Sequence, residues 1–191
     1  MRRDRGILWL TDGVVAPVLR YRPDALLVIG GPSGAGKSTL AARLFDSWLD
    51  ADDVRASLAA ARGVPVAEID WPEALARTRE TYAQQLAGGG GAVVVATAVR
   101  HGHRLRLAAD ADAAGVACHL LMLDASPELC RAGRAAQGEP PRIADGLFEH
   151  LVREWDAFRR ALARGALPDG IASVTVLDRA AVDALERVER R

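Results

Sequence analysis

Lysine is almost missing from this chain of 191 residues, because Lys37 is its only lysine and arginine supplies the rest of its 25 basic residues. The 25 acidic residues match them in number, so the formal net charge is zero. Proteins that bind nucleic acid usually show a basic excess or a basic stripe. The charge balance therefore makes nucleic acid the less favoured class of partner, and it leaves a small molecule as the favoured one.

Cysteine and long hydrophobic runs are also scarce. The two cysteines, Cys118 and Cys130, form no C-x-x-C pair and lie in apolar or helix-like segments, which predicts buried, reduced thiols. No apolar run reaches the ~18 residues that suggest a membrane span. The short apolar run near the start is broken by Thr11-Asp12-Gly13, so it does not resemble a secretory signal. We expect a cytoplasmic protein with no membrane partner.

The pattern of the chain predicts an α/β fold. Strand-like and helix-like segments alternate, which is typical of a parallel sheet between two layers of helices. Residues 1–24 are expected to form an N-terminal extension with a hairpin across Asp12-Gly13, and residues 25–191 to form the main domain. The expected strands are 25–30, 47–53, 92–98, 116–123 and 172–178, which make a five-stranded parallel sheet. The expected helices are 37–45, 54–62, 72–87, 103–114 and 143–164, and a charged helix closes the chain.

A glycine-rich loop follows the first of these strands and reads Gly31-Pro-Ser-Gly-Ala-Gly-Lys-Ser38. This is the phosphate-binding pattern G-x-x-x-x-G-K-[ST], and it stands where the pattern requires, between a strand and a helix. Its backbone N–H groups and the helix N-terminus would hold the phosphates of ATP, Lys37 would reach the β- and γ-phosphates, and Ser38 would bind Mg²⁺. The residues expected to bind the nucleotide are Gly31, Ser33, Gly34, Ala35, Gly36, Lys37, Ser38 and Thr39.

Two large classes of phosphate-loop protein are excluded. The guanine-binding motif N-K-x-D of G proteins needs a second lysine, and the L-S-G-G-Q-like signature of transporter ATPases does not occur. Two kinds of protein remain: a small kinase that uses a nucleoside triphosphate, or an ATP-binding module without catalytic activity.

Acidic residues follow the second expected strand in the run WLDADDVR. They are Asp50, Asp52 and Asp53, with Arg55 one residue beyond. Ligands bind at the carboxyl ends of strands in open α/β sheets. A kinase needs a carboxylate near the acceptor hydroxyl and an acid near Mg²⁺. The alternative is that these residues cap a helix and carry solvated charges.

Three segments together resemble one group of P-loop kinases. They are Gly31–Thr39, Asp52-Asp53-Val54-Arg55 and the run ATAVRHGHRLRL that follows the third strand. The group includes polynucleotide-kinase-type domains, gluconate-kinase-like enzymes and zeta-toxin-like kinases, and it implies the three-layer αβα fold of P-loop NTPases. The resemblance implies that Asp52 is the general base and, with Ser38, a metal ligand. It also implies that Asp53 and Arg55 bind the substrate.

One departure from that group bears on the substrate. The polynucleotide-kinase branch commonly ends its third strand in D-x-T/S-N, whereas this chain has Ala96-Thr97-Ala98. The gluconate-kinase-like branch has small, non-acidic residues there and then a basic residue, which Arg100 matches. The departure therefore favours a small-molecule acceptor, with Arg100 as a substrate contact.

Further arginines are candidates by resemblance. Arg79 falls in the apolar stripe of the 72–87 helix, which often covers the acceptor site in related kinases, so it is either a snorkelling side chain or an acceptor-binding one. Related kinases also carry an arginine-bearing lid after the fourth strand, here around residues 131–142. Arg131 and Arg134 are the expected catalytic arginines that stabilise the transferred phosphoryl group. His101 and His103 belong to a basic cluster that is either a solvated helix start or an anion contact.

The sequence thus predicts an ATP-dependent phosphotransferase that uses Mg²⁺ and phosphorylates a hydroxyl of a small molecule. A sugar, a sugar acid, a nucleoside or a natural product would each fit. A polynucleotide or RNA 5′-hydroxyl kinase and a non-catalytic ATP-binding regulatory module remain the alternatives. The oligomeric state is left open.

Overall fold

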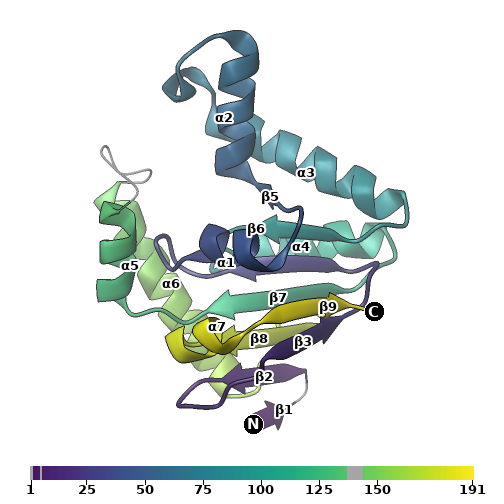
Figure 1. Cartoon of the computed structure of the whole chain (residues 1–191), viewed down its shortest axis with the longest axis vertical. Coiled ribbons are helices and arrows are strands. Elements are labelled where there is room, and N and C mark those ends of the chain that lie inside the picture. The colour runs from purple at the N-terminus through teal and green to yellow at the C-terminus, as the bar shows by residue number, and fades with distance from the viewer. Residues whose placement is uncertain (1, 5, 137–143) are drawn as a thin grey trace.

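A seven-stranded sheet forms the centre of the molecule in a computed structural model that describes residues 2–4, 6–136 and 144–191. Its strand order is β1-β2-β8-β7-β4-β6-β5, and all neighbours run parallel except β1 and β2 (Figure 1). The central strands are apolar and buried on both faces, as expected where helices cover both sides of a parallel sheet. The strands are β1 (Arg2–Asp4), β2 (Ile7–Leu10), β4 (Leu26–Gly30), β5 (Leu49–Asp50), β6 (Ala92–Val95), β7 (Cys118–Leu123) and β8 (Ser173–Leu177).

All five predicted strands are present, and the α/β prediction is confirmed. The sheet is larger than predicted because β2 adds to it in parallel beside β8, and β1 then adds to β2. The predicted hairpin across Asp12-Gly13 is wrong. A turn does form there, but β3 (Val18–Tyr21) leaves the main sheet and pairs in parallel with β9 (Arg187–Arg190). The closing helix is short, α7 (Arg179–Ala184), and β9 follows it.

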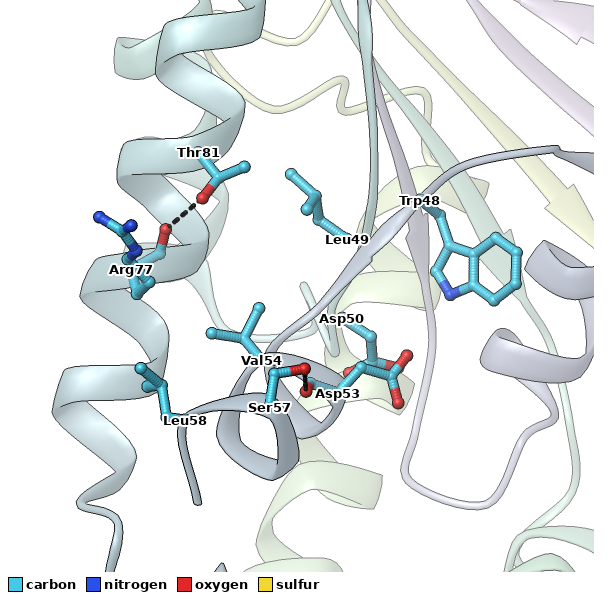
Figure 2. Close-up of a pocket in the computed structure, with 9 residues that line it drawn as sticks. All are labelled: Trp48, Leu49, Asp50, Asp53, Val54, Ser57, Leu58, Arg77 and Thr81. Atoms are coloured by element: carbon cyan, nitrogen blue, oxygen red, sulfur yellow. Dashed lines mark hydrogen bonds between the residues drawn. The ribbon is translucent and has the colours of Figure 1, made fainter. Parts of the chain in front are cut away.

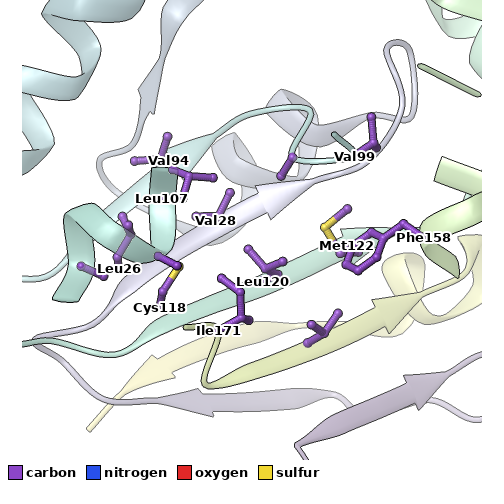
Figure 3. Close-up of a cluster of buried hydrophobic side chains, with 14 of the residues drawn as sticks. Leu26, Val28, Val94, Val99, Leu107, Cys118, Leu120, Met122, Phe158 and Ile171 are labelled. Carbon is purple, nitrogen blue, oxygen red and sulfur yellow. The ribbon is translucent and has the colours of Figure 1, made fainter. Parts of the chain in front are cut away.

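Helices cover the two faces of the sheet unequally. The helices α3 (Trp71–Ala87), α4 (His101–Ala113) and α6 (Asp145–Ala163) pack on one face, in a cluster that includes Leu120 and Met122 of β7 (Figure 3). On the other face lie α1 (Lys37–Leu44), α7 and the β3–β9 pair. None of the helices in the described ranges is long and apolar enough to cross a lipid bilayer.

The boundary between β5 and α2 (Ala51–Arg62) differs from the prediction. The strand ends at Asp50, whose side chain accepts a hydrogen bond from the backbone N–H of Asp52 and so caps the helix. The acids Asp52 and Asp53 therefore lie in the first turn of α2, where the positive end of the helix dipole favours them. The helix α2 and the start of α3 project from the carboxyl edge of the sheet as an arm.

The N-terminal strand β2 should contribute to folding stability. Ile7 is 1% exposed and packs in the same cluster as β7 and α6. We expect Ile7→Ala to lower the free energy of unfolding by about 2–4 kcal/mol, because it leaves a cavity in the core. Urea denaturation would measure the change, with Val15→Ala as the control, since Val15 is 47% exposed. Equal stabilities of the two variants would contradict the packing of β2.

Candidate active site

The phosphate loop connects β4 to α1 and holds its glycines in conformations that other residues avoid. Gly34 and Gly36 have φ angles of 83° and 90°, in the left-handed region. The first turn of α1 has no side-chain cap and no acidic residue. Its N–H groups are therefore available to an anion, and the helix dipole adds to that attraction.

Lys37 is held over this loop. Its Nζ donates a hydrogen bond to the carbonyl oxygen of Pro32 at 2.8 Å. Burial lowers the pKa of the Lys37 amine to about 8, and the nearby Asp50 opposes the shift. A triphosphate on the loop would replace the carbonyl as the partner of the ammonium group, and its negative charge would favour the protonated form.

Asp50 is the acid that meets the phosphate loop. Ser38 Oγ donates to Asp50 Oδ2 at 2.7 Å, while Asp50 Oδ1 accepts the α2 cap bond from the Asp52 N–H at 3.1 Å. Asp50 is only 8% exposed. A hydroxyl and a carboxylate at this distance fit Mg²⁺, which prefers oxygen ligands and keeps several waters. Sequence reasoning placed Asp50 in the acidic run but selected Asp52 as the metal ligand.

The other two acids of this run lie in the first turn of α2. Asp52 and Asp53 occupy neighbouring positions of the helix and so point to different sides of it. Asp53 lines a cavity of about 420 Å³ between α2 and α3, together with Trp48 and Asp50 (Figure 2). Across the cavity, α3 contributes Arg77 and Thr81.

The predicted substrate arginine Arg55 contacts the protein backbone. Its Nε donates to the carbonyl oxygen of Ile69 at 2.7 Å and one Nη to that of Ala67 at 3.4 Å. Its guanidinium lies 5.8 Å from the ring centroid of Trp71. Arg55 therefore holds the segment that returns the chain to α3, a contact that spacing along the sequence did not suggest.

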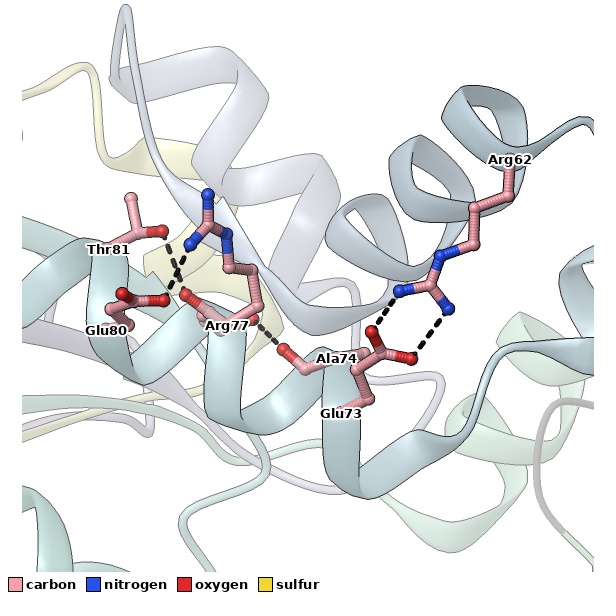
Figure 4. Close-up of polar contacts among 7 residues, drawn as sticks. Arg62, Glu73, Ala74, Arg77, Glu80 and Thr81 are labelled. Atoms are coloured by element: carbon pink, nitrogen blue, oxygen red, sulfur yellow. Dashed lines mark hydrogen bonds and ion pairs between the residues drawn. The ribbon is translucent and has the colours of Figure 1, made fainter.

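Arg79, the candidate acceptor-binding arginine of α3, is bound to α4, and a different arginine of α3 lines the cavity. Arg79 forms an ion pair with Asp110 of α4, which also accepts a hydrogen bond from the Tyr82 hydroxyl. It is Arg77 that lines the cavity beside α2. Arg77 also pairs with Glu80, and a second ion pair joins Arg62 of α2 to Glu73 of α3 near the far end of the arm (Figure 4).

The helix α5 (Pro127–Ala135) packs directly on the tip of the phosphate loop. A Cβ on Gly34 would collide with the carbonyl oxygen of Cys130, and a Cβ on Gly133 would collide with that of Gly34. The two backbones can approach this closely only because both positions are glycine. α5 therefore supports the tip of the loop through direct backbone contact.

The predicted lid arginines lie on α5 and contact α6. Arg131 pairs with Glu149 at 2.9 Å, and Arg134 pairs with Asp145 at 3.0 Å. The guanidinium of Arg134 also lies 4.4 Å from the ring centroid of Phe148. The rest of the predicted lid, residues 137–142, is outside the described residues.

The segment after β6 is anchored from two sides. Thr97 offers its carbonyl oxygen to the Gly31 N–H of the phosphate loop at 2.9 Å. Arg104, only 7% exposed, donates to the carbonyl oxygens of Ala98 and Val99, and Ala98 has the rare φ of 50°. Burial lowers the pKa of Arg104 to about 10. Arg100, the predicted substrate contact, occupies the N-cap position of α4 without a side-chain cap bond, and it is exposed.

Arg104 was missed by sequence reasoning, which grouped it with solvated basic residues. Its guanidinium lies 3.7 Å from the ring centroid of Phe158 in α6, a geometry that favours a cation over an aromatic face. The sequence signal for its burial was helical spacing, because Arg104 lies on the same face of α4 as the buried residues Leu107, Ala108 and Ala111.

A second cavity, of about 490 Å³, opens on the other side of the phosphate loop. It is lined by Pro32, by the segment after β7 and by α6. Asp124 lies at its base, where it accepts hydrogen bonds from Trp155 Nε1 at 3.1 Å and from Arg159 Nε at 2.9 Å. Among the residues that the structure describes, no group of three or more His, Cys, Asp or Glu side chains could hold a metal ion.

The glycine contact between α5 and the loop predicts an unusual effect of Gly133→Ala. Alanine normally stabilises a helix interior by ~1 kcal/mol relative to glycine. Here we expect a net loss of about 1–3 kcal/mol and weaker ATP binding, because the methyl group displaces Gly34. Gly146→Ala in α6 is the matched control, since nothing lies within 4 Å of its added Cβ. A Gly133→Ala protein as stable as that control would contradict the close contact.

The lowered pKa of Lys37 predicts a pH dependence of ATP binding. The free protein loses the ammonium charge as pH rises through about 8. We expect ATP affinity to fall about tenfold between pH 7 and pH 9, with proton uptake on binding in that range, since the triphosphate favours the charged amine. Calorimetry in buffers of different ionisation enthalpy would measure both quantities. Lys37→Arg should bind ATP with no such pH dependence. An ATP affinity that stays constant from pH 7 to pH 9 in the unmodified protein would refute the lowered pKa of Lys37.

Comparison with known proteins places this chain in a family. The family model described as an AAA domain matches residues 26–164. No curated protein matches the sequence. A gluconokinase from Sinorhizobium meliloti 1021 shares the fold at 18% identity and a TM-score of 0.50, over 86% of this chain and 91% of that one.

A second solved structure, described as the PezAT chromosomal toxin–antitoxin system of Streptococcus pneumoniae, aligns at 19% identity and a TM-score of 0.54. The alignment covers 90% of this chain and 72% of that chain. At these identities the two structures show the shared fold, and the family match covers most of the chain. The chain belongs to the AAA-domain family and has the fold of the small P-loop kinase group.

Proposed function

We propose that the protein is an ATP-dependent phosphotransferase that moves the γ-phosphate of ATP to a hydroxyl of a small molecule. The observation that carries this proposal is the joining of the phosphate loop to an acid-rich helix start through the Ser38–Asp50 hydrogen bond. Asp52 lies in the first turn of α2, two residues after Asp50, so this bond joins its helix to the phosphate loop. The kinase-like fold and the family match support an activity of this kind.

The nucleotide would bind through groups that the structure leaves accessible to an anion. The N–H groups of the loop and of the first turn of α1 hold the β-phosphate, and Lys37 contacts the γ-phosphate. Ser38 and Asp50 would hold Mg²⁺, directly or through water, and the ion would supply positive charge beside the phosphates. Arg131 and Arg134 are the arginines that the resemblance assigns to the transferred group, and they pair with acids of α6 here.

In the transfer step, Asp52 orients the acceptor hydroxyl and takes its proton. The acceptor oxygen forms a bond to the γ-phosphorus while the bond from that phosphorus to the β–γ bridging oxygen breaks. ADP leaves with the electron pair of the broken bond, and the phosphorylated acceptor leaves as a monoester. Charge moves between oxygens without a covalent intermediate on the protein, so positioning and electrostatics account for the catalysis.

A polynucleotide acceptor is less well supported. The arginine that the resemblance assigns to a substrate phosphate, Arg55, is hydrogen-bonded to two backbone carbonyl groups. The segment after β6 contains no acid, and the chain has no net positive charge. A small-molecule acceptor requires none of these features.

Transfer of label from γ-labelled ATP tests the proposal. The protein would be given a pool of sugars, sugar acids, nucleosides and natural products in one reaction, and a 5′-hydroxyl oligonucleotide in another. We expect label in the small-molecule pool, with loss of transfer in Lys37→Ala. Asp52→Asn should lower kcat by about 100-fold while ATP still binds, because the base is lost and the phosphate loop is intact.

Asp112→Asn is the matched control, since Asp112 is an exposed acid of α4 away from the phosphate loop. It should transfer label at the unmodified rate. Label on the oligonucleotide alone would show that the acceptor is a polynucleotide and not a small molecule. An Asp52→Asn protein with full activity would remove the catalytic role of Asp52. Absence of transfer by the unmodified protein, with ATP still bound, would instead favour a non-catalytic ATP-binding module.

A further inference from the structure

The turn between β6 and α4 contains an unfavourable backbone conformation. Ala98 has a φ of 50°, and among the described residues other than glycine only Asp12 shares a positive φ. The left-handed region is unfavourable for a residue with a β-carbon, so neighbouring groups must hold Ala98 there. Ala98 is completely buried, and its methyl group lies beside Gly30, the last residue of β4. The strained residue therefore lies next to the start of the phosphate loop.

The same turn holds the first residue of the phosphate loop. The Gly31 N–H donates a hydrogen bond to the carbonyl oxygen of Thr97 at 2.9 Å. That carbonyl group and the nitrogen of Ala98 belong to one planar peptide group. The φ angle of Ala98 therefore sets the direction of the Thr97 carbonyl relative to the rest of the turn. A change of conformation at Ala98 would turn this carbonyl away from Gly31.

Arg104 of α4 fixes the other side of the turn. One Nη of its guanidinium donates to the carbonyl oxygens of Ala98, at 3.1 Å, and of Val99. Two consecutive carbonyl groups that share one donor nitrogen must converge, so this contact restricts the torsion angles between them. The ring of Phe158, 3.7 Å from the guanidinium, limits the motion of the donor from the opposite side.

Arg104 is an unfavourable residue for burial at this position. It is 7% exposed and shares the buried face of α4 with Leu107 and Ala108. Among the residues that the structure describes, none forms a carboxylate ion pair with it, and a buried charge without such a partner is costly. An unbranched apolar side chain would fill the same space without that cost. What the arginine adds is the pair of hydrogen bonds to the turn.

We propose that Arg104 is a positioning residue of the phosphate loop: it holds Ala98 in the left-handed conformation and thereby directs the Thr97 carbonyl to the Gly31 N–H. The inference deepens the proposed function and rests on it for the effect on ATP. Arg104 acts through the backbone and not through contact with the nucleotide. Glycine adopts the left-handed conformation without the cost of a β-carbon, so Ala98→Gly should reduce the need for Arg104.

Calorimetric measurement of ATP binding by the full chain tests this dependence. Arg104→Met keeps an unbranched side chain but removes the donors, and we expect it to weaken ATP binding about tenfold. Ala98→Gly alone should bind ATP within about twofold of the unmodified protein, because its turn conformation is kept. Arg104→Met/Ala98→Gly should bind ATP about threefold more tightly than Arg104→Met, a coupling that a double-mutant cycle measures.

Two control variants separate this effect from general changes. Arg106→Met makes the same substitution at an exposed position of α4 and should bind ATP as the unmodified protein does. Ala96→Gly places glycine two residues before the strained position, where φ is not positive, and it should not restore ATP binding to Arg104→Met.

Hydrogen exchange of the Gly31 amide provides a readout that needs no ATP. The bond to Thr97 protects this N–H in the unmodified protein. We expect exchange to become about tenfold faster in Arg104→Met and to slow again in Arg104→Met/Ala98→Gly. The amide of Val176, which is fully buried in β8, reports the stability of the whole domain. Its exchange should be accelerated less than that of Gly31.

Three results would overturn the inference: unchanged ATP binding in Arg104→Met, no recovery with Ala98→Gly, or equal acceleration of exchange at Gly31 and Val176. The last result would mean that Arg104 only stabilises the core. Failure of the proposed function is a separate outcome. ATP binding that depends on Arg104 without transfer of label keeps the inference and removes the kinase. If the unmodified protein binds no ATP, the proposed function fails, and exchange at Gly31 still decides the role of Arg104.

Discussion

The carboxylate of Asp50 holds the candidate site together, because its two oxygens serve two different elements. One oxygen accepts a hydrogen bond from the Ser38 hydroxyl at the start of α1, and the other caps α2 through the N–H of Asp52. A single side chain therefore joins the start of α2 to the phosphate loop. A buried carboxylate needs such partners, since burial without hydrogen bonds is costly. The same carboxylate and the Ser38 hydroxyl are the groups that would hold Mg²⁺.

Close backbone contacts support the loop from the remaining sides. Gly34 and Gly133 bring α5 against its tip, and the Thr97 carbonyl binds the N–H of its first residue. Arg104 then ties the Thr97 segment to α6 through the ring of Phe158. These contacts limit the motion of the loop before any ligand binds, and limited motion reduces the entropy lost on binding. Packing of the neighbouring segments thus positions the polar groups around the phosphate loop.

The two cavities flank the phosphate loop and differ in what they offer. The one behind α2 contains Asp53 and an arginine, Arg77, that is already paired with Glu80. The one beside α6 contains two aspartates and two arginines, and Pro32 brings it to the edge of the phosphate loop.

Much of this protein could be read from its sequence alone, because the features concerned are local. The phosphate loop uses consecutive backbone N–H groups, so its pattern predicts its structure. Four core strands appear as buried apolar runs, whereas the strand predicted over 47–53 is only Leu49–Asp50. The tertiary structure decided which carboxylate meets Ser38, since that depends on where β5 ends and α2 begins. It also directed Arg55 to backbone carbonyl groups, Arg79 to Asp110 and β2 to the edge of β8. Each of these contacts joins residues that are distant in the sequence, or depends on which side of a helix a residue faces. The free energy of such contacts depends on packing that no local pattern encodes.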